Sequence, residues 1–294
     1  DLTANEQLMT TTELLDIVSI FVQHGVNKIR LTGGEPLIRK DFPQMLESLS
    51  SMPVSLSITT NGVILDRFFD AFRTAGLKDV NVSLDTLQSS KFFELTRRNQ
   101  FEKVYQNILN CIDEGFNTGI NVVLLKDRTE EELLPFVELT KSLKARVKFI
   151  EFMPFAGNRW DLSKILTGPH ALSVIKEAYG AKVVKMEDHP NSTSSNYRIK
   201  GYTGSFGLIN TVTNPFCQGC NRLRLTADGS LKNCLFSQSE TPLLPAYRAG
   251  KDITPLIAAS VGRKKKVRAG MKTLEEFSTS ENIERNRSMI TIGG

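Results

Sequence analysis

The chain has 294 residues, of which 40% are hydrophobic and 23% are charged, and this is ordinary usage for a soluble globular protein of one large domain or two. It contains no apolar run near the ~20 residues that cross a membrane, and its net charge of +5 is too mild to indicate nucleic-acid binding but fits an acidic small-molecule ligand. Three of its four cysteines are clustered, which favours a reducing compartment over a disulfide scaffold. The sequence opens at Asp1 without an initiator methionine, so we expect an upstream segment to be missing.

The first half of the chain alternates helix and strand. Strands are predicted over 28–32, 54–60, 80–84, 121–125 and 147–152. Helices are predicted between them, over 10–25, 41–50, 65–75, the stretch up to residue 115, and 129–143. This alternation predicts an α/β fold with right-handed βαβ units and a parallel sheet. The alternation does not decide between an open sheet and a closed barrel. Proteins of either architecture have their functional site at the carboxyl ends of the strands.

Polar motifs follow the ends of these strands. After the first strand, Gly33 and Gly34 allow a ligand to approach the backbone, and Glu35 offers an acceptor for an ammonium or a hydroxyl, although a plain βα turn is an alternative. Lys28 and Arg30 share one face of that strand. Three further strands end in small or polar residues, in the stretches Thr59-Thr60-Asn61-Gly62, Ser83-Leu84-Asp85 and Glu151-Phe152-Met153-Pro154. Together these motifs predict a pocket at one rim of the sheet.

The pattern changes from about residue 161. We expect a helix over 169–179, strand-like runs over 181–186, 197–201 and 204–210, and helices over 242–249 and 252–262. The basic run 263–266 fits either a nucleic-acid or targeting patch or, in the interpretation we favour, a solvated helix end. Residues 272–288 are polar and are expected to be mobile.

Cys217, Cys220 and Cys234 are spaced C-x2-C-x13-C. Gly219 favours a tight turn that brings the first two thiols together, and a hairpin turning at residues 227–229 would return the third to the same place. This arrangement predicts a metal site, and the alternative is a set of buried free thiols. Structural zinc takes four ligands and no histidine lies nearby, whereas three thiolates suit an iron–sulfur cluster with one open iron.

Arg222 and Arg224 lie two residues apart on a predicted strand just after the cysteine turn. Their guanidinium groups would then point to one side, where such forks bind phosphates or carboxylates. A solvated strand face is the alternative if the arginines are taken alone. Beside the cysteines, they predict an iron–sulfur cluster next to an anionic substrate.

The chain resembles the GTP 3',8-cyclase family of molybdenum-cofactor biosynthesis, which are radical S-adenosylmethionine (SAM) enzymes, over essentially its whole length. The resemblance rests on the cysteine hairpin, the terminal Gly293-Gly294, and the motifs at 31–36, 58–62, 81–85 and 149–153. It implies an incomplete TIM-like (β/α) barrel of the radical SAM type with a C-terminal iron–sulfur region. Residues 1–160 would form the partial barrel, and residues 161–294 would carry the auxiliary cluster hairpin and a Gly-Gly tail that reaches the active site.

The resemblance also implies two [4Fe-4S] clusters, one that binds and cleaves SAM and an auxiliary one that binds the GTP purine through its open iron. The auxiliary cluster would be ligated by Cys217, Cys220 and Cys234. The implied SAM-binding positions are Gly34, Ser83 and Met153, with Gly33 and Glu35 in the SAM-binding turn. The implied GTP-binding positions are Arg30, Thr59, Arg222 and Arg224, with Lys28 in the same basic strand. No catalytic side chain is assigned.

The implied reaction is the radical cyclisation of GTP to 3',8-cyclo-7,8-dihydro-GTP, the first step of molybdopterin synthesis, catalysed by a lyase. The implied partners are GTP, SAM, an electron donor and the next enzyme of the pathway, with a possible homodimer and with neither nucleic acid nor membrane. The sequences at 153–160 and 262–265 are similar to those of the animal proteins of the family, which implies that the protein is located in the mitochondrial matrix. A bacterial source would imply the cytoplasm.

The sequence departs from the family pattern in three places. The N-terminal C-x3-C-x2-C of the SAM cluster is absent, so a second cluster is expected only with an upstream segment. Gly119 stands where the family has a GTP-contacting lysine, and Lys148 stands where it has an arginine. Cys111 lies alone in a predicted helix and is interpreted as a core thiol. The alternative function is a truncated or inactive isoform that binds a cluster and a nucleotide without cleaving SAM; the Gly-Gly tail disfavours another radical SAM enzyme with an auxiliary cluster.

Overall fold

The structure is a computed structural model that describes residues 5–289, and it divides into two compact units. The first unit comprises Asp1–Leu56, Pro154–Arg159 and Cys220–Gly294, and the second comprises Ser57–Met153 and Trp160–Gly219. Each unit therefore combines segments that lie far apart in the sequence. The predicted division at residue 160 into a partial barrel and a C-terminal region stays a prediction.

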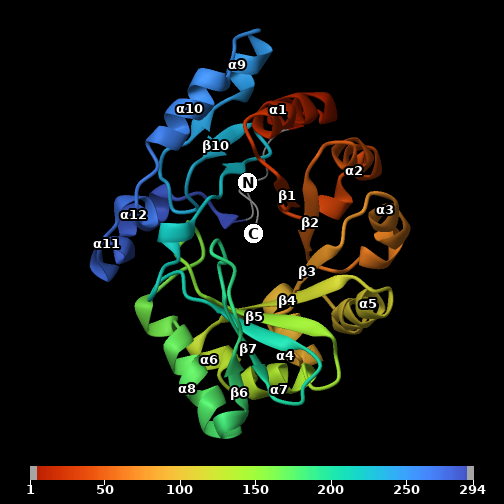
Figure 1. The fold of residues 1–294 in the computed structure, drawn as a ribbon. Helices are drawn as coiled ribbons and strands as arrows, with labels where there is room; N and C mark the ends of the chain where they lie inside the picture. The colour runs from red at the N-terminus through yellow and green to blue at the C-terminus, as the bar shows by residue number, and fades with distance from the viewer. Residues whose placement is uncertain (1–4, 290–294) are drawn as a thin grey trace. The chain divides into compact units, whose positions relative to one another are not determined.

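The second unit is built on a mostly parallel sheet (Figure 1). In spatial order its strands are β2 (Ser55–Thr60), β3 (Asp79–Ser83), β4 (Asn117–Leu124), β5 (Ala145–Glu151), β8 (Ser205–Ile209), β7 (Ser195–Ile199) and β6 (Val183–Lys185). The pairs from β2 to β5 are parallel, as is the pairing of β5 with β8, whereas β7 and β6 run antiparallel. The predicted parallel α/β sheet is confirmed, and the linear strand order shows an open sheet with β6 at an edge.

Helices connect these strands, as the alternation predicts. They are α3 (Phe69–Thr74), α4 (Ser89–Thr96), α5 (Phe101–Asp113), α6 (Lys126–Thr129), α7 (Leu133–Leu139) and α8 (Gly168–Tyr179). The central strands present apolar side chains that are fully buried, namely Ile58, Val80, Val82, Ile120, Val122, Val147 and Phe149. In β2 burial is continuous from Leu56 to Thr60, so both faces of that strand are covered, as is typical of a parallel sheet packed between helices.

Two predicted boundaries in this unit are wrong. Strand β4 begins at Asn117 rather than at residue 121, because Gly115 ends the preceding helix at a φ of 83° and Asn117 joins the sheet at once. The helix predicted over 129–143 is two shorter helices. They are separated because the Thr129 hydroxyl donates to the Val123 carbonyl and accepts from the Leu125 N–H, which closes α6 against the strand end.

The first unit begins with α1 (Thr11–Gln23), β1 (Lys28–Leu31) and α2 (Phe42–Ser50). Helix α1 starts where the sequence predicts because Thr10 and Glu13 form a capping box. Strand β1 exposes Lys28 and Arg30 and turns Leu31 inward, so the predicted shared face is confirmed. It neighbours the start of β2, where Ser55 donates its backbone N–H to the Asn27 carbonyl at 2.9 Å.

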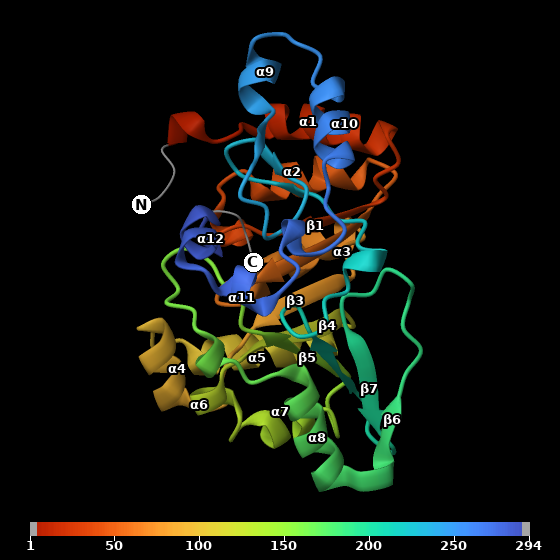
Figure 2. The same ribbon diagram turned by 90° about the vertical axis from the view of Figure 1, so that its left-hand side faces the viewer.

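The cysteine hairpin belongs mainly to this unit (Figure 2). Its elements are β9 (Arg224–Leu225), β10 (Ser230–Lys232) and β11 (Thr241–Pro242), followed by α9 (Leu244–Arg248) and α10 (Thr254–Gly262). Leu231 of β10 packs in a buried cluster with Ile17 and Phe21 of α1 and with Ile257 of α10. The turn requires Gly229, because its φ is 70° and a Cβ there would lie 2.4 Å from the Leu244 Cβ.

Three predictions for the C-terminal region need comment. The antiparallel hairpin is confirmed, but β9 begins at Arg224, so Arg222 does not lie on the strand. The stretch 272–288, expected to be mobile, contains α11 (Leu274–Ser278) and α12 (Ser280–Arg285). Although this stretch is polar, it contains a second capping box, at Thr273 and Glu276. It also contains one buried aromatic residue, Phe277, whose ring centroid lies 4.8 Å from that of Phe236. Gly293-Gly294 lies outside the described residues.

No helix within residues 5–289 has the length and apolar character needed to cross a membrane.

Candidate functional site

The cysteine turn places its thiols in partly buried positions. Cys217–Gly219 forms a short 3-10 turn, and Cys217, Cys220 and Cys234 are half-buried cysteines. Gly219 is required by space, because a Cβ at this position would lie 2.5 Å from the Pro190 carbonyl oxygen. Among residues 5–289, no three or more His, Cys, Asp or Glu side chains are grouped so as to hold a metal ion. The ligand role of the three cysteines therefore remains a prediction.

Two cationic side chains donate to the sulfur of Cys220. The Lys264 Nζ lies 3.5 Å from the Cys220 Sγ, and a guanidinium nitrogen of Arg222 lies 3.6 Å from the same atom. Burial opposes ionisation of this thiol, but the Arg222 backbone N–H and the charges of Lys264 and Arg222 outweigh it and hold the pKa of Cys220 below its ordinary value. The basic run is thus more than a solvated helix end, a role that composition alone did not reveal.

A second concentration of positive charge lies on β1 and β9 of the first unit. Burial and the nearby charge of Arg30 lower the pKa of Arg224 to about 10. The structure therefore brings together two of the predicted GTP contacts, at a cost in electrostatic repulsion. Binding of a polyanion to this pair would offset that repulsion.

Behind the hairpin, the end of β10 carries a buried lysine. Lys232 is 1% exposed, and its Nζ lies 3.1 Å from the Asn286 Oδ1 and 3.5 Å from a carboxylate oxygen of Glu240. Arg287 donates to both Glu240 and Asp228 at 2.9 Å. These contacts connect the hairpin to the segment after α12, and sequence reasoning missed them because the partners lie about 50 residues apart.

The predicted SAM-binding turn follows β1. Gly33 and Gly34 form a bend, and the Glu35 carboxylate accepts from the Leu37 N–H at 3.2 Å, capping the 3-10 helix Pro36–Ile38. One predicted acceptor of this turn therefore has a local structural partner. The assignment of these residues to SAM stays a prediction.

In the second unit, Thr59 of β2 is buried, whereas Ser83 at the end of β3 is exposed and Met153 follows β5 by two residues. The register of β2 and β3 pairs Thr59 with Asn81, two residues before Ser83. The structure thus places Thr59 and Ser83 near the ends of neighbouring strands, and Met153 just past β5, which β4 separates from β3. Their contacts with SAM or GTP remain predictions.

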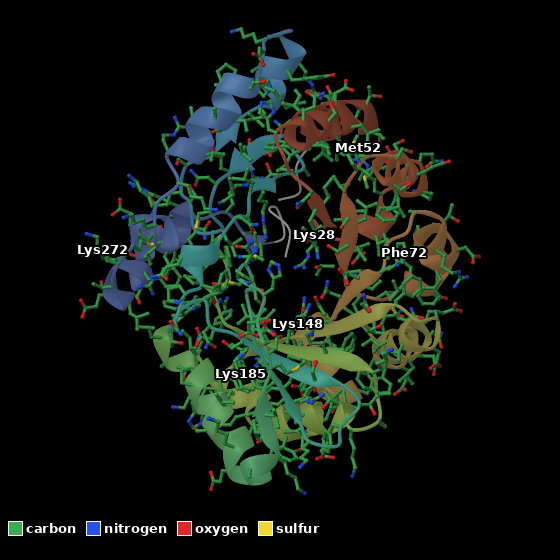
Figure 3. The ribbon with its side chains drawn as sticks, viewed as in Figure 1. Lys28, Met52, Phe72, Lys148, Lys185 and Lys272 are labelled. Atoms are coloured by element: carbon green, nitrogen blue, oxygen red, sulfur yellow. The ribbon has the colours of Figure 1, made fainter. Side chains whose placement is uncertain are left out.

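Lys148, the lysine that replaces a family arginine, lies on β5 (Figure 3). Its ammonium donates to the Asn81 side chain, whose amide nitrogen donates in turn to the Ile58 carbonyl at 3.1 Å. A Cβ at Gly119 would lie 2.5 Å from the Asn81 Oδ1 and 3.0 Å from the Lys148 Nζ. The two departures from the family pattern are therefore adjacent, and Gly119 provides the space in which Lys148 meets Asn81.

Glu151, in the last position of β5, is a fully buried carboxylate. It accepts hydrogen bonds from the backbone N–H groups of Gly168, Val212 and Thr213 at 2.8–2.9 Å, and from the Thr213 hydroxyl at 2.5 Å. Four donors satisfy the buried charge and fix the chain four residues before Cys217. Sequence reasoning placed Glu151 in a strand-end motif but did not predict this role.

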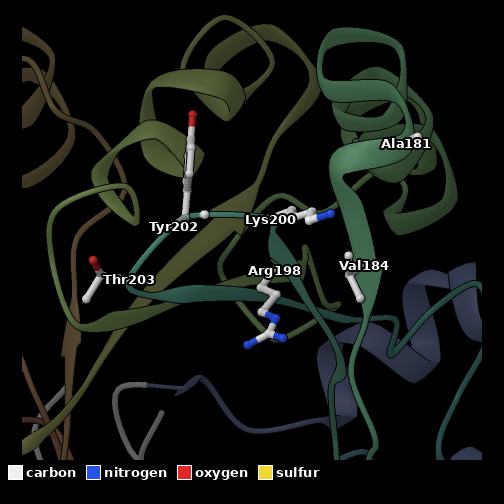
Figure 4. A pocket seen from close by; sticks show the side chains of 7 residues that line it. Ala181, Val184, Arg198, Lys200, Tyr202 and Thr203 are labelled. Carbon is white, nitrogen blue, oxygen red and sulfur yellow. The ribbon is translucent and has the colours of Figure 1, made fainter.

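An open depression of about 640 Å³ lies elsewhere in the second unit (Figure 4). Its lining consists of Ala181, Val184, Arg198, Lys200, Gly201, Tyr202 and Thr203. None of the predicted site residues contributes to it. The site residues predicted from the sequence therefore lie outside this depression.

The chain matches two family models. The Radical SAM superfamily matches residues 3–140, and Molybdenum Cofactor Synthesis C matches residues 145–269. Among solved structures, the fold is similar to that of Streptococcus suis SuiB, with a TM-score of 0.62 at 13% identity, covering 96% of this chain and 71% of that one. The same protein bound to S-adenosylmethionine gives a TM-score of 0.61 at 14% identity, covering 96% and 70%. These findings define a radical SAM protein with the predicted incomplete-barrel fold.

Named relatives narrow the family further. The chain is 40% identical over 300 residues to the GTP 3',8-cyclase, mitochondrial, of Arabidopsis thaliana, covering 100% of this chain and 75% of that protein. It is 38% identical over 296 residues to the GTP 3',8-cyclase of Peptoclostridium acidaminophilum, covering 99% and 87%. The human molybdenum cofactor biosynthesis protein 1 is 40% identical over 297 residues, an alignment that covers 99% of this chain and 45% of that protein. The chain thus spans about half the length of the human relative. It belongs to the GTP 3',8-cyclase family of molybdenum cofactor biosynthesis.

The radical SAM family uses a [4Fe-4S] cluster and SAM, and the residues of the hairpin fit an iron–sulfur cluster by their chemistry. Cys220 and Cys234 are half-buried thiols, and two cations donate to the sulfur of Cys220. Such a setting favours the thiolate that ligates iron. The chemistry of the donor set thus supports the predicted auxiliary cluster, whose cysteine count stays a prediction.

Proposed function

We propose that this chain binds GTP beside an auxiliary iron–sulfur cluster and acts in the radical SAM cyclisation of GTP to 3',8-cyclo-7,8-dihydro-GTP. The observation that carries this proposal is the desolvated arginine Arg224, which lies near Arg30 in the same unit as Cys220 and Cys234. Like charges in a desolvated setting favour a polyanionic ligand, and a nucleoside triphosphate supplies three or more negative charges.

Each proposed residue has one task. Arg30, Arg222 and Arg224 bind the triphosphate, with Lys28 adding charge on the exposed face of β1. The cysteines would hold the auxiliary cluster, which would supply an open iron for the purine. Residues 33–35, together with Ser83 and Met153, would orient SAM, and SAM would supply, on one-electron reductive cleavage, the radical that abstracts the ribose 3' hydrogen. Joining C3' of the ribose to C8 of the guanine leaves an unpaired electron on the base, and a second electron from the electron donor together with a proton would remove it.

Lys148 is expected to contact the substrate differently from the arginine of the family pattern. Its ammonium is a single charge held by Asn81, whereas an arginine would present a planar fork. Gly119 removes the second cation of the family pattern. We expect the remaining triphosphate contacts to come mainly from the arginines of the first unit.

The proposed partners follow from the same chemistry. An electron donor must supply the reductive cleavage of SAM, and the next enzyme of the pathway must take up the cyclised nucleotide. A mitochondrial matrix location is proposed because the Arabidopsis relative is named a mitochondrial GTP 3',8-cyclase.

Anaerobic reconstitution tests the proposal. The chain is expected to take up about one [4Fe-4S] cluster, and a variant with Cys217, Cys220 and Cys234 all replaced by serine should take up none. Iron and sulfide content and visible absorbance measure the result. Stoichiometric zinc in anaerobically handled protein, with no cluster uptake, would contradict the assignment.

The alternative function is a binding module that holds the cluster and the nucleotide without cleaving SAM. It is supported by the cysteines of these 294 residues, which form no C-x3-C-x2-C. The purified chain is therefore expected to produce no 5'-deoxyadenosine from SAM and dithionite. Substantial production of 5'-deoxyadenosine would show that residues of this chain bind the radical cluster, which we expect only with an upstream segment.

A further inference from the structure

Lys264 is the second residue after helix α10, and it reaches the cysteine turn. Its Nζ lies 3.5 Å from the Cys220 Sγ and 2.7 Å from the Arg222 carbonyl oxygen. The ammonium therefore donates both to the sulfur and to the backbone that follows it. A contact with two atoms of one turn defines the position of the turn more closely than a contact with the sulfur alone would.

The end of α10 is itself fixed against the hairpin. Asn233, next to Cys234, donates its side-chain N–H to the Ser260 carbonyl at 2.7 Å, and Ser260 is buried. The Lys264 N–H donates to the Val261 carbonyl at 3.0 Å, which continues the helical end. Helix α10 thus connects the Cys220 turn and the Cys234 end of the hairpin.

The neighbouring lysines provide a contrast within the same basic run. Lys265 and Lys266 are exposed, whereas Lys264 is partly buried. All three carry the same charge, but of the three, within residues 5–289, only Lys264 donates to a thiol, the Cys220 Sγ. The geometry therefore distinguishes Lys264, which contacts the cysteine turn, from the exposed Lys265 and Lys266.

We propose that Lys264 is a positioning residue for Cys220 as a cluster ligand and that its hydrogen bond sets the reduction potential of the cluster bound there. This inference rests on the proposed function, in which Cys220 ligates the auxiliary cluster. Donors to a ligating sulfur withdraw electron density and stabilise the reduced, more negative cluster, so they raise its potential. They also orient the ligand, and loss of such partners typically weakens metal binding about 10–100-fold.

The test replaces Lys264 with methionine, which keeps the apolar stem and removes the donor, and with arginine, which keeps a charged donor. Lys265→Met and Lys266→Met are matched controls that remove the same charge from exposed positions. All four variants and the unaltered chain are reconstituted anaerobically. Midpoint potential is measured by a redox titration followed by electron paramagnetic resonance, and cluster retention by the rate of iron loss to a ferrous chelator.

We expect Lys264→Met to lower the midpoint potential and to lose iron about 10–100-fold faster, with intermediate values for Lys264→Arg. The two control variants should match the unaltered chain. Circular dichroism and melting temperature check that the variants are folded. If the methionine variant does not fold, the arginine variant still tests the inference.

Three results would overturn the inference. A cluster-loaded Lys264→Met with unchanged potential and iron loss would show that the hydrogen bond has no role. Weaker GTP binding with an unchanged potential would make Lys264 a substrate cation instead. Absence of a cluster in every protein, the unaltered chain included, would refute the proposed function itself and this inference with it, and this pattern differs from a failure confined to Lys264.

Discussion

The interior of the second unit and the cysteine hairpin of the first treat ionisable groups in opposite ways. In the second unit, the Glu151 carboxylate is buried with four donors around it, and the Cys111 thiol is buried in α5, where desolvation raises its pKa to about 11. At the hairpin, Cys220 has a lowered pKa, and Arg224 lies desolvated near another arginine.

The two regions balance charge differently. A buried group whose hydrogen bonds all come from its own unit stabilises the fold. Arg30 and Arg224 carry like charges, and an anion bound beside them would offset their repulsion. The comparison favours a structural role for Glu151 and Cys111, and the binding role of the hairpin cations stays a prediction.

The largest expected effect is on Glu151. Glu151→Gln replaces one accepting oxygen with a donating NH2 group and leaves two of the four donors without an acceptor, each of which costs roughly 1–3 kcal/mol. The free energy of unfolding should fall by about 2–6 kcal/mol, measured by urea titration. Glu187→Gln, at an exposed position, is the control and should change it by under ~0.5 kcal/mol. A stability loss no larger than that of the control would show that Glu151 is not a structural charge.

A smaller effect is expected at the arginines. Arg222→Ala or Arg224→Ala should weaken GTP binding about 10–100-fold, because a hydrogen bond to a charged partner contributes roughly 1.5–3 kcal/mol. Lysine should restore only part of the affinity, since a point charge cannot reproduce a bidentate fork. Isothermal titration with GTP and guanosine measures this. Cluster content should stay unchanged for Arg224→Ala, whereas Arg222→Ala also removes a donor to the Cys220 sulfur.

Guanosine serves as the control ligand for the arginine variants. It lacks phosphates, so it should bind weakly and respond little to either substitution. Equal losses for GTP and guanosine, or loss of the cluster, would show that the arginines support the hairpin rather than bind the triphosphate.

The smallest expected effect concerns Cys111 and pH. Its thiol ionises near pH 9 when unfolded but only near 11 when folded, so its contribution to stability is present below pH 9 and is lost as the pH rises from 9 to 11. Between pH 8 and 10 the loss should be about 1 kcal/mol, and Cys111→Ala should remove that part of the pH dependence. The measurement is the difference in unfolding free energy between the two pH values for each protein. Identical differences in the two proteins would show that Cys111 does not contribute.

The sequence by itself determined the alternation of elements, the parallel sheet and the hairpin around Cys217, Cys220 and Cys234. These features follow from local rules: apolar periodicity, a capping box at Thr10, and glycines that end helices or form turns. It also predicted that Lys28 and Arg30 share a face, because the strand period is two residues. Cys111, which lies alone in a predicted helix, was correctly predicted to be a core thiol.

Only the tertiary structure decided which polar residues meet. Lys264 reaches Cys220 across 44 residues of sequence, Thr213 donates to Glu151 across 62, and Lys232 contacts Asn286 across 54. No local pattern carries such pairings, since they depend on how the chain returns in space. For the same reason the basic run at 263–266 and the polar stretch at 272–288 were misjudged from composition: one lysine and one phenylalanine in them acquire their roles from residues that the sequence places far away.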